Sequence, residues 1–301
     1  MSSLAVIAWP YHAGLGDVNM GLGASTLSGD EQLRHMLGQE VDELTIERVP
    51  PVEESLPELA RIFELDRWLA RRVADARRRG QFPLVLGGDC ISCLGTTAGI
   101  REDRHLGVIW LDAHADFDTP EDNLSGFTDV MGLSILTGGC WRGLRDTIPG
   151  FRTVDERHVV MIGTRDLERY QRERLDASRI RVIAGEVDGD ELRSALGDLH
   201  QHVEQVYLHV DLDVLDTSVG HANSYAAGGG PDLSTVLGAI SETFAHLTVK
   251  AAALTAYDPR VDDTASIAAA AREIGRQIAR GAATSSAKSV SPRRDDRGKR
   301  P

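Results

Sequence analysis

The feature that most constrains the fold of this chain is an alternation of short apolar runs with longer amphipathic stretches. Eight short runs are expected to be strands: Leu4–Trp9, Leu44–Val49, Pro83–Leu86, Gly107–Leu111, His158–Ile162, Arg181–Ala184, Val206–Val210 and Val249–Tyr257. The stretches between them resemble helices, at residues 30–38, 56–79, 92–101, 130–138, 166–176, 188–203, 232–246 and 263–280. Several runs are almost continuously apolar, as in strands buried on both faces of a parallel sheet. The pattern therefore predicts an α/β fold, a three-layer sandwich around an eight-stranded, mostly parallel sheet.

The chain is long enough for one large layered domain, with 301 residues of which 42% are hydrophobic. Neither an internal repeat nor a change of composition occurs before residue 281, so we expect a single domain over residues 1–280. From Gly281 onward the sequence is rich in Ser, Lys and Arg. This composition predicts a disordered basic tail over residues 281–301.

The net charge is −13, which disfavours a nucleic-acid-binding surface. No apolar run reaches the roughly 18 residues that a membrane span needs, and the N-terminus lacks the basic region of a signal peptide. Three cysteines, an odd number in a long chain, fit a reducing compartment better than a disulfide framework. We therefore expect a cytoplasmic protein without a membrane or nucleic-acid partner.

The strand that ends at Leu111 is followed by potential metal ligands at every second position. Asp112, His114 and Asp116 alternate with alanines, and an extended segment would point all three side chains to one side. A solvated turn is the alternative, because Asp is common in turns. The strict alternation directly after a buried strand favours a metal site.

A second acidic pair, Asp211 and Asp213, follows the strand that ends at Val210. Carboxylates gathered at one sheet edge would repel each other strongly unless cations were bound. Oxygen ligands with one imidazole suit Mn²⁺ best, and Fe, Co, Ni or Zn remain alternatives. So many carboxylates for one histidine suggest two ions sharing bridging aspartates. His209, between two apolar residues, is expected to be a hydrogen-bonded core residue instead.

A third motif, Gly87-Gly88-Asp89-Cys90, follows the strand that ends at Leu86. The glycines allow a tight turn, and a thiolate at Cys90 would be favoured by the helix dipole and by a metal. Cys90 and Cys93 also form a CxxC pair, which is typical of thioredoxin-like redox sites. That alternative leaves the Asp and His clusters unexplained.

Taken together, GGDC (87–90), DAHAD (112–116) and DLD (211–213) resemble the three signature motifs of the ureohydrolase family, which includes arginases and agmatinases. The resemblance covers roughly residues 4–280 and implies a single α/β domain with two Mn²⁺ ions. It also implies an assembly of three or six chains.

The resemblance implies a role for each ligand. Asp112 and Asp211 would bridge the two ions, Cys90 and Asp116 would complete one, and His114 and Asp213 would complete the other. The family pattern has His where this chain has Cys90; family members similar to Nω-hydroxy-arginine hydrolases carry Cys there. In the implied mechanism the ions activate a water molecule that attacks the amidino carbon, and Asp116 holds this nucleophile by a hydrogen bond.

The segments that bind substrate in the family depart further from its pattern. Asp118 replaces an Asn and would attract a cation, Ser125 is retained, and Asp129 replaces the proton-shuttling His and is expected to relay protons. Glu168 corresponds to an acidic residue that grips the substrate's amino group. Ala256 stands where the family has a Glu that pairs with the guanidinium.

The sequence therefore predicts a hydrolase that cleaves a C–N bond of a guanidino or amidino compound, with release of urea or a related product. Nω-hydroxy-arginine or a modified arginine derivative is the most concrete substrate. The alternative is a degenerate family member with a regulatory or structural role, which the changes at Asp129 and Ala256 keep open.

Overall fold

A computed structural model describes residues 1–100, 105–123, 125–185, 187–203 and 205–290. Its main sheet has eight strands in the order β4-β1-β5-β10-β9-β6-β7-β8, and every adjacent pair is parallel. The strands are β1 (Ser3–Trp9), β4 (Glu43–Arg48), β5 (Phe82–Gly87), β6 (Leu106–Leu111), β7 (Val159–Thr164), β8 (Arg181–Ala184), β9 (Gln205–Asp211) and β10 (Thr248–Thr255). The predicted α/β fold and all eight predicted strands are confirmed.

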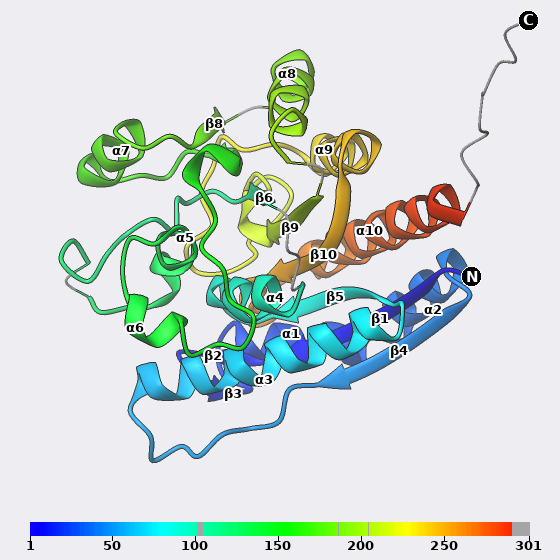
Figure 1. Cartoon of the computed structure of the whole chain (residues 1–301), viewed down its shortest axis with the longest axis horizontal. Helices are drawn as coiled ribbons and strands as arrows, with labels where there is room; N and C mark the ends of the chain where they lie inside the picture. Colours follow the sequence, from blue (N-terminus) through cyan, green and yellow to red (C-terminus); the bar gives the residue numbers. More distant parts are fainter. Residues whose placement is uncertain (101–104, 124, 186, 204, 291–301) are drawn as a thin grey trace, which may run out of the picture.

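Helices cover both faces of the sheet (Figure 1). One face packs against α1 (Gly21–Gly29), α2 (Glu31–Glu40), α8 (Gly189–His200), α9 (Leu233–His246) and α10 (Ser266–Val290). The other packs against α3 (Glu58–Arg78), α4 (Cys93–Ile100), α5 (Gly132–Thr137), α6 (Arg142–Arg145) and α7 (Arg169–Asp176). Alternate residues of one strand enter opposite cores: Leu4 and Val6 of β1 face one layer, whereas Ala5 and Ile7 face the other. This division is the three-layer sandwich that the apolar strands predict.

A short hairpin and a short helix lie near the start of the chain. The hairpin β2 (Tyr11–His12) and β3 (Leu15–Gly16) directly follows β1, and α1 comes next. None of the predicted segments included these elements or α6.

The last helix corrects the predicted start of the tail. α10 runs to Val290, with Ala279 and Ala282 both buried, so the chain is helical past Gly281 rather than disordered from there. Small apolar residues of α10 pack on the domain, so the helix continues beyond the position where the apolar pattern of the sequence becomes weak. The rest of the predicted tail, residues 291–301, lies outside the described residues. Among the described helices, none has the combination of length and apolar character needed to cross a bilayer.

Candidate metal centre

The predicted ligands meet at the carboxyl ends of central strands. GGDC follows β5, DAHAD follows β6, and DLD begins at the end of β9. β9 and β6 are neighbours, and β10 alone separates β9 from β5. The sheet order thus brings three segments, far apart in sequence, to one edge, where α/β proteins bind ligands.

The GGDC turn places Cys90 at the floor of this site. A Cβ atom at Gly88 would lie 2.1 Å from the carbonyl oxygen of Tyr11, so only glycine allows this approach. The short helix η1 (Cys90–Ser92) begins directly after the turn. The buried Sγ of Cys90 lies 2.9 Å from Oδ2 of Asp211 and 3.4 Å from Oγ1 of Thr255.

The DAHAD segment does not continue β6 as an extended strand. The backbone bends at Ala113 and His114, and Asp116 has a left-handed φ of +46°. The carboxylate of Asp112 accepts hydrogen bonds from the Trp110 indole at 2.9 Å and from the His114 backbone at 2.7 Å. A turn, not alternation along a strand, therefore carries these ligands to the site.

The DLD segment is tied to DAHAD by hydrogen bonds. Asp211 Oδ1 accepts from the Asp213 backbone at 2.8 Å, and Asp213 Oδ1 accepts from the Ala113 backbone at 3.3 Å. Nδ1 of His114 lies 3.3 Å from Asp213 Oδ2 and 3.4 Å from Asp112 Oδ1. One imidazole therefore faces carboxylates of both motifs.

Burial and mutual repulsion control the protonation of this cluster. Burial raises the pKa values of Asp116 and Asp211 well above the usual range, and neighbouring carboxylates raise them further. The same two causes, burial and then the charge of Asp213, raise the pKa of Asp112 to about 6. The pKa of Asp213 is lowered despite its burial, because His114 lies beside it. The raised pKa values mean that these carboxyls favour their neutral forms unless a positive charge lies close to them.

The donor set fits divalent cations. The ligand atoms of Cys90, Asp116 and Asp129 lie within 4.8 Å of one another, and so do those of Asp112, His114 and Asp213. Oδ2 of Asp116 is buried and has no hydrogen-bond partner among the described residues. A buried, unpartnered carboxylate oxygen is costly unless a cation satisfies it.

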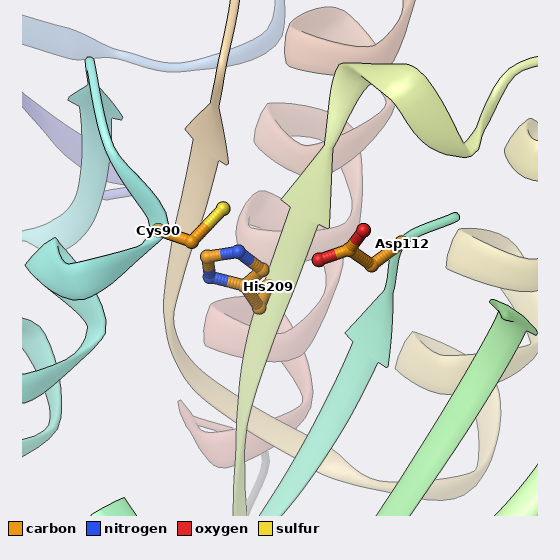
Figure 2. Close-up of side chains that lie close together, drawn as sticks. All are labelled: Cys90, Asp112 and His209. Atoms are coloured by element: carbon orange, nitrogen blue, oxygen red, sulfur yellow. The ribbon is translucent and has the colours of Figure 1, made fainter. Parts of the chain in front are cut away.

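His209 lies between Cys90 and Asp112 on β9 (Figure 2), but both of its ring nitrogens have partners. Nδ1 lies 2.7 Å from the hydroxyl of Tyr207 and Nε2 lies 3.3 Å from that of Thr255. The ring stacks on Trp110 at 3.7 Å, and burial lowers its pKa to about 3. These contacts are those of the core histidine that the sequence predicts.

A pocket opens above the cluster. Cys90, His114, Asp116, Asp129, Asp211 and Asp213 are among its lining residues. Asp129 Oδ1 accepts a hydrogen bond from the backbone of Ile91 at 3.2 Å, and burial, followed by the charge of Asp89, raises its pKa. Asp129 therefore adjoins both the pocket and the GGDC turn.

The predicted substrate-binding residues lie outside the lining of this pocket. Asp118 is buried and accepts hydrogen bonds from Tyr170 at 2.9 Å and from Gln171 at 3.1 Å. Ser125 is exposed and donates to Asn123, and Glu168 is exposed at the N-terminus of α7, where it forms a capping box with Gln171. Ala256, by contrast, lines the pocket.

Two residues that hold the site together were not predicted from the sequence. Asn223 is buried and donates to Asp213 Oδ2 at 3.1 Å and to the carbonyl of Ala256 at 2.9 Å. The guanidinium of Arg165 donates to backbone carbonyls around DLD, including that of Asp213 at 3.1 Å and that of Ala227 at 2.7 Å. Neither belongs to a ligand motif, and only the position of Asn223 in a loop after DLD gave a signal.

Fold and site together define an α/β protein with a buried, carboxylate-rich metal-ligand cluster at the carboxyl edge of a parallel sheet. The chain belongs to the arginase family, whose family model matches residues 22–279. This finding confirms the resemblance to ureohydrolases.

Individual relatives agree with this assignment. An arginase of Bacillus caldovelox is 31% identical over 234 residues, which cover 72% of this chain and 78% of that protein. An arginase of Staphylococcus aureus is 29% identical over 183 residues, so the match spans about 60% of its length and 58% of this chain. The solved structure of the Bacillus caldovelox arginase superposes with a TM-score of 0.80 and 25% identity, covering 92% of this chain and 98% of the other.

Proposed function

We propose that this chain is a hydrolase that cleaves a C–N bond of a guanidino or amidino compound at a site for two Mn²⁺ ions. The observation that carries the proposal is the convergence of the three motifs, because all six predicted ligands lie at one sheet edge. Five of them line a single pocket, and the sixth, Asp112, has its Oδ1 3.4 Å from Nδ1 of His114. Membership of the arginase family supports the same reaction class.

The six side chains would hold the metal in two groups. Cys90 and Asp116 would bind one ion, His114 and Asp213 the other, and Asp112 and Asp211 would be shared. Burial and the charge of Asp211 raise the pKa of the Cys90 thiol, and a cation at the site would reverse this balance and favour the thiolate. When bound, the two ions lower the pKa of a water molecule and so supply a nucleophile at neutral pH.

Two carboxyl groups of the pocket would take part in hydrogen bonding and proton transfer during the reaction. Asp116 would accept a hydrogen bond from the attacking group through its carboxylate. Asp129 adjoins the same pocket, and its raised pKa allows it to hold a proton for the leaving amine.

Nω-hydroxy-arginine or another arginine derivative is the narrowest form of the proposal, and Cys90 among the ligands is the feature that favours it. In this form Asp118, Ser125 and Glu168 would contact the substrate, although all three lie outside the pocket lining. A cytoplasmic location also stays a prediction. Assembly into three or six chains is a further prediction, which light scattering can check.

The test is product release by purified protein after loading with Mn²⁺, with arginine, Nω-hydroxy-arginine, agmatine and guanidino acids as substrates. We expect metal-dependent release of urea or a related product from at least one compound, and its loss in Asp213→Ala. Asp198→Asn is the matched control, because Asp198 is exposed on α8. Two bound ions without hydrolysis of any amidino compound would contradict the proposed reaction.

A non-catalytic role is the second candidate, and one observation favours it. Ala256 lines the pocket where the family has a Glu that pairs with the guanidinium. The absence of both bound metal and hydrolysis would support this candidate.

A further inference from the structure

The pocket above the metal ligands has two chemically different sides. Its floor consists of the acidic and metal-ligating side chains. Its wall is apolar and is formed by Met20, Phe127, Val130, Tyr225 and Ala256. A substrate whose amidino carbon reaches the floor must therefore place the rest of the molecule against this wall.

Phe127 and Tyr225 of the wall belong to a row of three rings, and the third ring, that of His12, lies outside the pocket lining. Phe127 lies in the middle, with its ring centroid 5.4 Å from that of His12 and 5.9 Å from that of Tyr225. The rings of Phe127 and Tyr225 are stacked with an interplanar angle of 28°. The three rings come from separate segments: His12 belongs to β2, and Phe127 and Tyr225 lie in the segments that follow β6 and β9. We call His12, Phe127 and Tyr225 the aromatic row.

Both ends of the aromatic row are anchored to the site. Nδ1 of His12 lies 2.8 Å from Oδ1 of Asp89, the residue before Cys90. At the other end, Oδ1 of Asn223 accepts a hydrogen bond from the Tyr225 backbone at 2.8 Å, while its amide donates to Asp213. The row is therefore fixed relative to the metal ligands, yet Tyr225 remains 50% exposed and extends to the surface.

The pocket has few groups that could bind the charged carboxylate of an amino-acid substrate. Its lining, taken from the described residues, includes neither Lys nor Arg, so a carboxylate would meet no ammonium or guanidinium group there. The amide of Asn223 already has partners. Asp118 is held by Tyr170 and Gln171, outside the lining. A flat, uncharged group matches the wall better, because aromatic rings prefer offset-stacked or edge-to-face contacts with one another.

We propose that the preferred substrates are guanidino or amidino compounds that carry a neutral, planar apolar substituent, such as an aryl group, stacked on Phe127 and Tyr225. This inference rests on the proposed function and names the substrate class of the same site.

The experiment compares benzylguanidine with arginine and 4-guanidinobutyrate on the Mn²⁺-loaded protein, both as substrates and as ligands in calorimetric titrations. We expect kcat/KM and affinity to be about two- to tenfold higher for benzylguanidine, the range that one favourable aromatic contact supplies. Phe127→Ala and Tyr225→Ala should remove most of this preference, whereas Tyr225→Phe keeps the ring and should retain it. Ile46→Ala is the control for general loss of apolar surface, because Ile46 is exposed on β4 and outside the pocket.

The outcomes separate this inference from the proposed function. If arginine is hydrolysed as well as or better than benzylguanidine, the inference is overturned and the proposed function stands. If benzylguanidine binds with the expected dependence on both rings but no compound is hydrolysed, the recognition of the aryl group stands and the proposed reaction is overturned. If benzylguanidine neither binds nor reacts, or if the alanine variants keep the preference, the inference is wrong.

Discussion

The thiol of Cys90 lies 2.9 Å from Oδ2 of Asp211, although 121 residues separate them in the sequence. This contact joins the GGDC turn after β5 to the DLD segment at the end of β9, across the intervening strand β10. It places a soft sulfur atom within a cluster of hard carboxylate oxygens.

Replacement of Cys90 is expected to weaken one of the two metal sites. Cys90→Ala removes a ligand from the group shared with Asp116, so a titration with Mn²⁺ should show one tight site in place of two. In the wild type, Co²⁺ should produce a sulfur-to-metal absorption band that Cys90→Ser lacks. Cys140→Ala is the control, because Cys140 contacts Ser134 and does not line the pocket. If Cys90→Ala binds both ions as tightly as the wild type, Cys90 is not a ligand.

Asp129→Asn tests whether this residue relays protons or binds metal. As a proton relay, Asp129 is expected to contribute about 10²-fold or more to kcat. The variant should therefore keep both ions, and its kcat should fall by about 10²-fold or more on the compound that the wild type hydrolyses fastest. Loss of one ion from Asp129→Asn would instead identify the residue as a ligand, an arrangement allowed by its distance from Cys90 and Asp116.

Asp66 is expected to make the protein less stable as the pH rises. It is fully buried, and one of its carboxylate oxygens has no hydrogen-bond partner within the part of the chain that the structure describes. Burial raises its pKa well above the usual value despite a hydrogen bond from Gly95. Because the folded-state pKa exceeds the unfolded one, the favourable contribution of Asp66 is complete below about pH 4 and is lost as the pH rises through the folded-state pKa.

Asp66→Asn removes this titration but can still accept the hydrogen bond from Gly95. At pH 8 the variant should be more stable than the wild type by at least about 1.4 kcal/mol, the free energy of one pKa unit, and the gain should shrink at pH 5. Urea unfolding in the presence of a chelator measures both values, with Asp263→Asn, an exposed position, as the control. A pH dependence identical to that of the wild type would refute the prediction.

Arg165→Lys tests the network behind the DLD segment. The planar guanidinium donates to carbonyls of Asp213, Val214 and Ala227, among others, and lysine cannot reproduce this fork of hydrogen bonds. We expect a loss of about 2 kcal/mol in the free energy of unfolding and weaker Mn²⁺ binding. Arg169→Lys on the exposed surface of α7 is the matched control, and equal unfolding midpoints for both variants would contradict the role of Arg165.

The sequence allowed the strands and the ligand clusters to be predicted because both leave strong local patterns. Buried parallel strands are nearly continuous in apolar residues, and the ligands cluster within a few residues of a strand end. The order of the strands leaves no such pattern, and it is the order that brings Cys90 to Asp211.

Other features escaped prediction because tertiary contacts, not local propensity, produce them. α1 (Gly21–Gly29) contains three glycines and lacks an apolar stripe, but a Cβ at Gly23 would lie 1.9 Å from the Tyr257 carbonyl, so glycine permits its close packing. Asn223 is a single amide in a glycine-rich region, and its importance follows only from its contacts with Asp213 and Tyr225.

We propose that six residues of the GGDC, DAHAD and DLD segments form a site for two divalent ions. The most direct test is equilibrium dialysis of the purified chain against Mn²⁺, followed by metal analysis of the wild type and of Asp213→Ala. We expect close to two ions per wild-type chain and fewer in the variant. A wild type that binds no Mn²⁺, or a variant with the same content as the wild type, would contradict it.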